Sequence, residues 1–572
     1  MLPLSLLYFL AAAAASDVRH TQVVILGGGI SGISLARTLT AHNITDFVLL
    51  EARDELGGRA HTATLRGSAG DVVVEKGCNW IQGPGKEPIV ALAKKWGLKT
   101  TPTNYSSAVW FEGLGVEADG ERGRFLAPEE TDAFMLDYDD FIENAPGYSE
   151  WRSNNSLVDV SVRVATSIMD WMPVTPLQRA YEYWNIDYTF AQSPEESSFA
   201  NAFAQEAGIA NERDDFVVDP RGFKYIFVQE AREMFGQKLT DERLRLNTTV
   251  HTIDYSALGN GRDTGGKDKD KGKGKGGDKD GRREEHKRED KTAGTTKPDR
   301  PEILVHTDKG TFAAPHVVST FSVGVLQHQD VKWVPRLPDW KKEAIFTFAM
   351  ATYQKIFFLF EKQFWGDSEF IMYSDPDERG RYMVWQNINA PGYFPPGANN
   401  VLMVTATGAF GRRNEQMSDE EIVEEALVVL REMYGDVPAP LDALVPRWTL
   451  DPLFRGSYSN WPLGALDQHH SNLGQPLGGA QSWLHFSGEA TSADSFGYVQ
   501  GAWDQGIRTA EAIVACFAGD CPDATVYEAV TTCEQDETTM SRRSVRGAGG
   551  RKRGGAPRRH AILPQKQKEK KN

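Results

Sequence analysis

The chain has 572 residues, a formal net charge of −16 and 40% hydrophobic residues. Such a length can bury a large core and predicts more than one domain, whereas four cysteines are too few for a disulfide scaffold. Beyond the N-terminal run no 18 consecutive residues are apolar, so the composition predicts no membrane anchor. The acidic charge can attract polycations, although it would also serve solubility alone.

The first 16 residues are apolar and end in five alanines and a serine. This pattern predicts a cleavable signal peptide over residues 1–16, although a basic n-region is missing. N-glycosylation sequons begin at Asn43, Asn104, Asn154 and Asn247, and they matter only on a secretory route. We therefore expect a secreted glycoprotein.

A glycine-rich turn lies between an apolar run at 23–26 and a helix-like stretch that reaches about residue 41. The glycines of its G-x-G-x-x-G pattern are Gly27, Gly29 and Gly32. A second strand-like run at 47–50 ends in Glu51. In such a unit the backbone N–H groups approach a pyrophosphate at the helix N-terminus, and the carboxylate accepts hydrogen bonds from a ribose. The unit predicts that the chain binds an adenine dinucleotide.

Later motifs narrow the kind of dinucleotide. Gly57-Gly58-Arg59 adds a guanidinium that can neutralise pyrophosphate charge. Three further motifs contain the neighbouring residues Asn79-Trp80, Gly488-Glu489 and Tyr498-Val499. Together these motifs resemble the flavin-dependent amine oxidases.

The middle of the chain is similar to the polyamine oxidase branch of that family. The segments that carry this similarity are 221–223, 243–247, 351–357, 445–448 and 456–462. The resemblance covers about residues 20–520 and implies an α/β fold. It implies a Rossmann-like FAD-binding domain of the GR2 type combined with a discontinuous α+β substrate-binding domain.

The resemblance also implies domain limits. The FAD-binding domain takes residues 18–99, 206–335 and 474–525, and the substrate-binding domain takes 100–205 and 336–473. The active site is expected between them at the flavin. The local pattern agrees, because 337–348 reads as a helix and 352–360 as a half-buried strand.

Two segments have a composition that cannot support a core. Residues 261–300 are rich in Lys, Asp, Gly and Arg and predict a disordered insert. We place it in a hairpin between strand-like runs at 249–255 and 303–306. Residues 541–572 contain 12 Lys and Arg and one acid, which predicts a basic disordered tail.

The cysteines allow one disulfide near the C-terminus. Cys516, Cys521 and Cys533 are close in sequence, and the pair among them stays open. Cys78 is expected to be a packed thiol rather than a nucleophile.

By resemblance, the reaction is oxidation of an amine C–N bond to an imine. Hydride passes to FAD, and O₂ is then reduced to H₂O₂. Lys355 stands in an otherwise apolar run, where a charge is costly; the family's matching lysine holds a water against the flavin N5 and assists reoxidation. Tyr498 and Tyr458 match aromatics on either side of the substrate nitrogen. These three are the predicted catalytic residues.

The remaining site residues follow from the same resemblance. The expected cofactor-binding residues are Gly27, Gly29, Gly32, Glu51, Arg53, Arg59, Asn79, Trp80, Val250, Gly488, Glu489, Tyr498 and Val499. The expected substrate-binding residues are Gln82, Tyr353 and Tyr458. We expect a small-molecule amine and O₂ as reaction partners, a monomer, and neither metal nor nucleic acid.

Two departures leave the substrate open. Gln82 and Thr189 stand where family members carry an acid or, at the first position, a histidine, and Asp187 or Glu195 would have to compensate. An oxidase of another amine or of an amino acid is one alternative, with Arg381 or Arg447 as a carboxylate partner. A flavin-binding scaffold without catalysis is the other.

Overall fold

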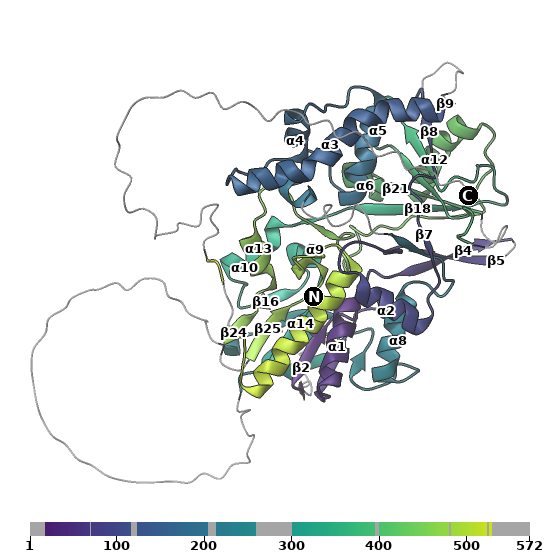
Figure 1. Ribbon diagram of the computed structural model, residues 1–572. Helices are drawn as coiled ribbons and strands as arrows, with labels where there is room; N and C mark the ends of the chain where they lie inside the picture. Colours follow the sequence, from purple (N-terminus) through teal and green to yellow (C-terminus); the bar gives the residue numbers. More distant parts are fainter. Residues whose placement is uncertain are drawn as a thin grey trace, which may run out of the picture. The chain divides into compact units, whose positions relative to one another are not determined.

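A six-stranded sheet lies beside helices α1 (Ile30–Ala41) and α14 (Val499–Ala518) in the computed structural model (Figure 1). The structure describes residues 18–68, 70–115, 123–203, 213–258, 300–394, 400–479, 482–522 and 526–528. The sheet order is β11 (Leu244–Arg245), β3 (Phe47–Leu50), β2 (Val23–Leu26), β15 (His316–Ser319), β25 (Ser482–Phe486) and β24 (Leu477–Gly479). All neighbours are parallel except β24 and β25. Strands β2 and β3 are fully buried apolar runs, as expected for a parallel sheet that is covered on both faces.

Helices α1 (Ile30–Ala41), α8 (Lys224–Phe235) and α14 (Val499–Ala518) pack beside this sheet (Figure 1). A Cβ on Gly506 would lie 1.9 Å from Ser34 Oγ and 2.3 Å from Ser31 O. Only a glycine therefore allows α14 to approach α1 this closely. The short helix α2 (Glu87–Trp96) lies next to α8.

A five-stranded sheet lies next to the first. Its order is β1 (Val18–His20), β14 (Gly310–Ala314), β13 (Ile303–Thr307), β12 (Val250–Asp254) and β16 (Lys332–Val334). Strands β12 and β13 pair antiparallel, which confirms the predicted pairing of the runs on either side of the insert. The 3₁₀ turn η1 (Ser256–Leu258) follows β12.

A seven-stranded sheet carries the predicted strand around Lys355. Its order is β22 (Asp442–Leu444), β18 (Tyr353–Leu359), β21 (Val401–Thr407), β20 (Val384–Asn387), β19 (Phe370–Ser374), β8 (Ala108–Glu112) and β9 (Arg124–Phe125). The prediction of a half-buried strand is wrong, because β18 is buried on both faces. Ile356 and Phe358 join one hydrophobic cluster, and Phe357 and Leu359 join another.

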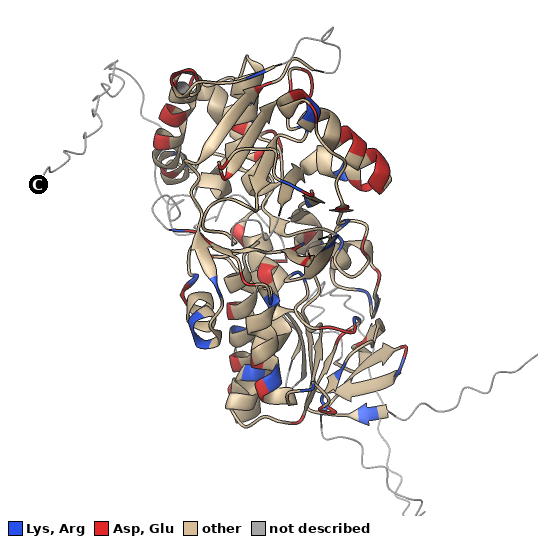
Figure 2. Ribbon diagram, turned by 90° about the vertical axis from the view of Figure 1, so that its right-hand side faces the viewer, with Lys and Arg blue, Asp and Glu red and all other residues tan. Residues whose placement is uncertain are grey.

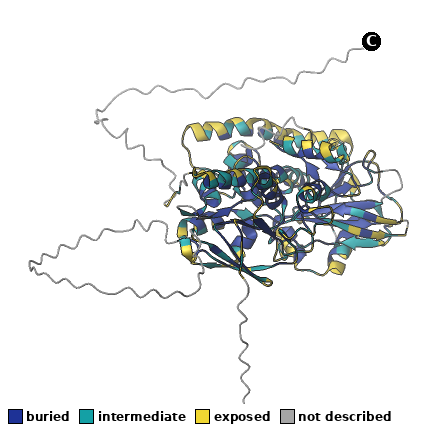
Figure 3. Ribbon diagram, turned by 90° about the horizontal axis from the view of Figure 1, so that it is seen from below, coloured by how far each residue is buried: buried dark blue, intermediate teal, exposed yellow. Residues whose placement is uncertain are grey.

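Helices and short strands pack on this sheet, and the exposed residues of the helices lie on the outside (Figure 3). The helices are α3 (Pro128–Asn154), α4 (Val162–Ile168), α5 (Pro176–Asn185), α6 (Asp187–Phe190), α11 (Gly408–Glu415) and α12 (Asp419–Tyr434). Asp and Glu residues are frequent on the surface helices, in keeping with the net charge (Figure 2). Among the described residues, no helix is both long and apolar enough to cross a membrane.

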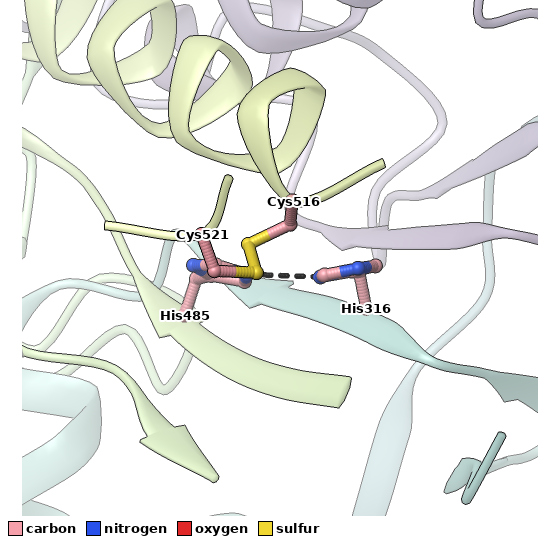
Figure 4. Close-up of a disulfide and its surroundings, with 4 residues drawn as sticks. All are labelled: His316, His485, Cys516 and Cys521. Atoms are coloured by element: carbon pink, nitrogen blue, oxygen red, sulfur yellow. Dashed lines mark hydrogen bonds between the residues drawn. A yellow bond between two sulfur atoms is a disulfide. The ribbon is translucent and has the colours of Figure 1, made fainter. Parts of the chain in front are cut away.

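Smaller elements complete the described fold. Short sheets pair β6 (Trp80–Ile81) and β7 (Thr100–Pro102) with β10 (Asp215–Val217), β4 (Thr62–Gly67) with β5 (Gly70–Glu75), and β17 (Ala349–Met350) with β23 (Ser459–Asn460). The remaining helices are α9 (Val323–His328), α10 (Asp339–Thr347), α13 (Asp467–Gly474) and η2 (Glu489–Thr491). Cys516 in the last turn of α14 is bonded to Cys521 beyond the helix (Figure 4), which is one of the disulfide pairs that the sequence left open.

The sheets follow the proposed division of the chain. Every strand of the six-stranded sheet lies in the segments assigned to FAD binding, and every strand of the seven-stranded sheet lies in those assigned to substrate binding. All described residues belong to one compact unit that ends at residue 530. The domain limits therefore stay a prediction. The predicted signal peptide, residues 261–299 of the insert, the tail and Cys533 lie outside the described residues.

Candidate active site

The glycine turn after β2 adopts a conformation that side chains would obstruct. Gly27 has φ +108°, and a Cβ there would lie 2.5 Å from Thr320 Oγ1. Gly29 is the N-cap of α1 and supplies no capping side chain, so the first N–H groups of the helix remain open to a ligand. A Cβ on Gly32 would lie 2.0 Å from Gly27 O, so Gly32 lets the helix pack on the turn.

A second glycine turn lies directly over the first. Gly29 and Gly57 form a parallel backbone bridge, and a Cβ on Gly58 would lie 3.2 Å from Gly29 Cα. Two side-chain-free backbones therefore meet at the N-terminus of α1. This is the surface that a pyrophosphate needs for close approach.

Glu51 is fixed at the end of β3 by two backbone donors. Gly28 N donates to Oε2 at 2.7 Å, and Arg53 N donates to Oε1 at 2.8 Å. The carboxylate lines the cavity, and its remaining lone pairs can accept from ribose hydroxyls.

The half-buried Arg59 and the buried Glu489 form an ion pair between segments 430 residues apart in sequence. Arg59 Nη1 donates to Glu489 Oε1 at 2.8 Å and to Ser457 O at 3.0 Å. Burial alone would raise the pKa of Glu489, but Arg59 and donors from Ser459 Oγ and Gly497 N outweigh burial and lower that pKa. Glu489 is therefore ionised and fixes the guanidinium beside the glycine turns.

One cavity of about 810 Å³ connects these features. It is lined by every predicted site residue except Gly32: Gly27, Gly29, Glu51, Arg53, Arg59, Asn79, Trp80, Gln82, Val250, Tyr353, Lys355, Tyr458, Gly488, Glu489, Tyr498 and Val499. These residues come from segments spread over more than 450 positions of the chain. The fold thus brings the predicted cofactor and substrate residues to one space.

Lys355 on β18 is 4% exposed and faces this cavity. Its Nζ donates to Gly77 O at 2.5 Å and to Asn79 Oδ1 at 2.6 Å, and it lies 5.4 Å from the centre of the Trp80 ring. Burial lowers the pKa of Lys355 to about 8. Because an ammonium has three N–H bonds, the two acceptors found among the described residues leave one for a group in the cavity.

Aromatic rings enclose the cavity near Lys355. Tyr353 and Tyr458 have ring centroids 5.9 Å apart, and Tyr458 Oη donates to Thr189 O at 3.0 Å. Burial raises the pKa of both phenols well above the usual range, so both are neutral. The Tyr498 ring lies against Gly83, where a Cβ would be 2.8 Å from the ring.

Four further lining residues did not emerge from the sequence. Tyr188 lies 5.6 Å from Tyr353, Trp184 stacks on Tyr188 at 4.7 Å, and Tyr105 lies 6.1 Å from Trp184. Tyr105 is 42% exposed and donates through Oη to Asp214 Oδ2 at 2.9 Å. Tyr188 adjoins Thr189, which the sequence did single out, whereas nothing in their spacing marked Trp184, Tyr105 or Asp214.

The acids and arginines that the sequence offered as alternative substrate-binding residues form ion pairs outside the described cavity lining. Asp187 receives two hydrogen bonds from Arg379 at 2.6 and 2.7 Å, and Glu195 accepts from Arg163 at 2.7 Å. Arg381 pairs with Asp375 at 3.5 Å, and Arg447 pairs with Asp419 at 2.5 Å. These residues are absent from the described cavity lining, whereas Gln82 and Thr189 belong to it.

The glycine turns, Glu51 and the Arg59–Glu489 pair together provide what a bound dinucleotide needs. The adjoining end of the cavity is apolar and aromatic, with one buried lysine. Fold and site together define a dinucleotide-binding protein whose cofactor site would open on an aromatic part of the same cavity.

Comparison of the sequence with known proteins supports a dinucleotide-binding enzyme and identifies the dinucleotide as a flavin. The profile of the flavin containing amine oxidoreductases matches residues 30–275 and 291–514. Polyamine oxidase 1 of Zea mays is 32% identical over 514 residues, covering 86% of this chain and 90% of the relative. Polyamine oxidase 6 of Oryza sativa subsp. japonica is 32% identical over 538 residues, covering 90% and 95%.

Solved structures share the fold. A putrescine oxidase with bound putrescine superposes with a TM-score of 0.63 at 17% identity, covering 87% of this chain and 100% of the other. The cyclohexylamine oxidase from Brevibacterium oxydans IH-35A gives 0.60 at 17% identity, covering 87% and 99%.

The chain belongs to the flavin containing amine oxidoreductase family. It is an FAD-dependent oxidoreductase that acts on CH–NH groups. The predicted family, fold class, enzyme class and cofactor are thereby confirmed. The roles of individual site residues stay predictions.

Proposed function

We propose that this enzyme is a polyamine oxidase that cleaves a C–N bond of spermine, spermidine or their N-acetyl forms and releases H₂O₂. The names of the plant relatives support this substrate class. The observation that carries the proposal is a cavity lined by a buried lysine, by neutral tyrosines and by the carboxylate residue Asp214 among further aromatic rings.

Bound FAD would accept a hydride from the carbon beside the amine nitrogen. The glycine turns, Glu51 and Arg59 would hold the dinucleotide. Tyr353, Tyr458 and Tyr498 would keep the reacting end dry and hold a neutral amine in a narrow slot. Lys355 would present its remaining N–H bond to this space and hold a proton at Nζ.

Asp214 would bind the distal charge of the substrate. Asp214 lines the same cavity as the stacked rings of Trp184 and Tyr188, whose faces also attract cations. Tyr105 Oη holds Oδ2 of Asp214 at 2.9 Å. Such an acid would serve where Gln82 and Thr189 carry no charge.

An amino-acid oxidase is less well supported, because it needs a cation for the substrate carboxylate. The arginines in the described cavity lining are Arg53 and Arg59. Both lie within eight residues of Glu51 in the sequence, among the residues assigned to the dinucleotide. Arg59 is already paired with Glu489. The buried position of Lys355 at the cavity argues equally against a scaffold without catalysis.

The test is a peroxide assay with polyamines, N-acetylpolyamines, monoamines and amino acids on wild type and on Asp214→Asn. We expect polyamine turnover with H₂O₂ release, and a KM at least tenfold higher in Asp214→Asn for polyamines than for a monoamine. Asp215→Asn is the matched control, because Asp215 pairs with Arg213 outside the described lining. Preference for an amino acid, or equal KM changes for all amines, would contradict the proposal.

Secretion belongs to the same proposal and rests on residues 1–16 and the four sequons. Expression in a secretory host should yield medium-borne enzyme whose mass falls on deglycosylation. Enzyme retained inside the cell without glycans would contradict it.

A further inference from the structure

A row of alternating charges joins α4, α5 and α6 to the loop that follows β19. Arg379 in this loop donates to both carboxylate oxygens of Asp187 at 2.6 and 2.7 Å. It also donates to Glu182 Oε2 at 3.0 Å, and Arg163 donates to both oxygens of Glu182 at 2.5 and 2.6 Å. None of these four residues belongs to the described lining of the active-site cavity.

Both carboxylates in this row are buried. Glu182 is fully buried, and Asp187 is 7% exposed. Glu182 would keep Arg163 as a partner without Arg379, whereas Arg379 supplies both hydrogen bonds that the described residues give to the Asp187 side chain. Burial raises the pKa of Asp187 to about 7, and the guanidinium of Arg379 keeps that pKa from rising further. The placement of Asp187 therefore depends on Arg379.

The loop that carries Arg379 is itself held in place. Gly380 has φ +84°, and a Cβ there would lie 2.2 Å from Tyr183 Cε2. Only a glycine therefore lets the loop pack against α5 at this point. The guanidinium carbon of Arg379 lies 5.7 Å from the centre of the same ring, and Asp375 Oδ1 accepts from two backbone N–H groups of the loop at 2.9 and 2.8 Å. Arg379 thus reaches α5 and α6 from a fixed turn.

Other residues of the same two helices line the active-site cavity. They are Trp184, Asn185, Tyr188, Thr189 and Phe190. Helix α6 has four residues and ends at Ala191 with φ +52°. So short a helix is not stable by itself, and tertiary contacts must fix its position. Asp187 is its first residue and directly precedes Tyr188, so the ion pair with Arg379 acts next to the cavity lining.

We propose that Arg379 is a positioning residue for amine binding, which acts through Asp187 to hold Tyr188 and Thr189 at the active-site cavity. Binding groups must be placed accurately, since a shift of about 1 Å can cost about 100-fold in rate. The inference rests on the proposed function for the assignment of this part of the cavity to the amine. It holds for whichever amine the enzyme oxidises.

The effect should be confined to the amine. The ring of Tyr188 lies 5.6 Å from that of Tyr353, and Thr189 O accepts from Tyr458 Oη at 3.0 Å. Loss of the ion pair would therefore loosen this aromatic part of the cavity. The glycine turns precede α1 and Lys355 lies on β18. FAD binding and reoxidation should accordingly not depend on the ion pair.

The experiment compares FAD-loaded wild type with Arg379→Gln in stopped flow, using the best substrate from the amine panel. In Arg379→Gln, Asp187 can take up a proton instead of remaining an unpaired charge, so the fold can survive. We expect the apparent Kd of the amine in anaerobic flavin reduction to rise at least tenfold. FAD content and the rate of reoxidation by O₂ should stay within twofold. Arg379→Lys restores the charge without the paired donors of a guanidinium and should give an intermediate Kd.

Arg413→Gln is the matched control. Arg413 also donates two hydrogen bonds to one carboxylate, that of Glu425, at 2.9 and 2.6 Å, and it lies outside the described cavity lining. This variant should leave the Kd of the amine unchanged. An unchanged Kd in Arg379→Gln, an equal rise in Arg413→Gln, or an equal loss in reoxidation would overturn the proposal.

If Arg379→Gln fails to fold, Asp187→Asn decides the case. The amide keeps one acceptor for Arg379, which also stays paired with Glu182, but the charge and the second acceptor are lost. We expect the Kd of the amine to rise at least threefold, and an unchanged Kd would overturn the proposal. Wild type that oxidises no polyamine would refute the proposed substrate class, whereas the same measurements with its best amine would still test Arg379.

Discussion

At the residue scale, Lys355 combines deep burial with one N–H bond that no described residue accepts. Lys355→Met keeps the volume of the stem and removes the ammonium, so packing in β18 should survive. We expect flavin reoxidation by O₂ to slow at least tenfold, about 1.4 kcal/mol of barrier, and anaerobic reduction by the amine to change less. Stopped-flow measurement of the two half-reactions separates them.

Lys332→Met is the control, because Lys332 is exposed at the start of β16, and it should leave both half-reactions unchanged. Unchanged reoxidation in Lys355→Met would reduce Lys355 to a structural role. A loss confined to reduction would assign it to substrate positioning.

Glu75, two residues before Gly77, is a buried carboxyl with one satisfied oxygen. Phe223 N donates to Oε1 at 2.5 Å, and Oε2 has no partner among the described residues. Burial raises the pKa of Glu75 to about 7. The hydrogen bond from Phe223 N and the charge of Lys355 lower this pKa, but by less than burial raises it. In the folded state Glu75 keeps its proton to a higher pH than in the unfolded state. Its contribution to the free energy of unfolding is therefore complete below about pH 4.5 and is lost as the pH rises through 7.

Glu75→Gln keeps an acceptor for Phe223 N and cannot ionise. Between pH 4.5 and 8, wild type should lose up to ~3 kcal/mol of unfolding free energy relative to this variant. Urea unfolding of the FAD-loaded proteins at both pH values measures this difference. The exposed Glu143→Gln should follow wild type, and parallel pH curves for wild type and Glu75→Gln would refute the assignment.

The sequence could predict those site residues that lie within one short motif, and it could not predict those that only tertiary packing brings together. The Gly27 turn and Glu51 fall within one strand–turn–helix unit, and Lys355 was marked by the apolar run around it. Asp214, Trp184 and Tyr105 approach the cavity from separate segments, and their only link is tertiary packing. Gly32 belongs to the same motif, yet its contact with Gly27 O places it in the packing of α1 outside the described cavity lining.

At the element scale, α10 is fixed to the end of α13 by one buried lysine. Lys341 Nζ donates to the carbonyls of Asn472, Leu473 and Gln475 at 2.6, 2.9 and 2.6 Å and lies 4.1 Å from the centre of the Phe486 ring. Burial lowers the pKa of Lys341, yet three acceptors match the three N–H bonds of the ammonium form. The charge also complements the C-terminal dipole of α13.

Lys341→Met removes all three donors and leaves buried carbonyls unpaired. We expect the unfolding free energy to fall by about 3 kcal/mol, measured by urea unfolding at equal FAD occupancy. Lys342→Met is the matched control one residue away, because Lys342 forms an exposed pair with Asp339. Its effect should stay within about 0.5 kcal/mol, and equal losses in both variants would contradict the role of Lys341.

Helix and strand positions were largely predictable, and solvent exposure was not. The runs at 23–26 and 47–50 became β2 and β3 without change, and 337–348 contains α10. The alternation in 352–360 indicated a half-buried strand, but helices and strands from distant segments cover both faces of β18. The alternation of residue types along a strand indicates which side chains face one side of the sheet. Whether the other side of the sheet is also covered depends on segments far away in the sequence.

At the scale of the whole molecule, the insert can be tested as a dispensable loop. Deleting residues 261–299 and joining the flanks with a short Gly/Ser turn should leave FAD content and turnover within about twofold of wild type. The deleted segment has almost no apolar surface to bury, and closure entropy changes slowly with loop length. Flavin absorbance and steady-state assays check this. Loss of FAD binding would show that the insert is structural.

The order of strands in the six-stranded sheet also determines how the protein must be made. Strand β2 is synthesised early, but its neighbour β15 follows about 290 residues later, and β25 about 165 residues after that. At about 5–20 residues per second, the ribosome needs roughly 15–60 s to supply β15. During that time the nascent chain carries an apolar strand with an open hydrogen-bonding edge, which favours intermolecular pairing. Chaperone occupancy and translation speed, rather than the stability of the finished enzyme, should therefore limit the yield of native protein in a cell.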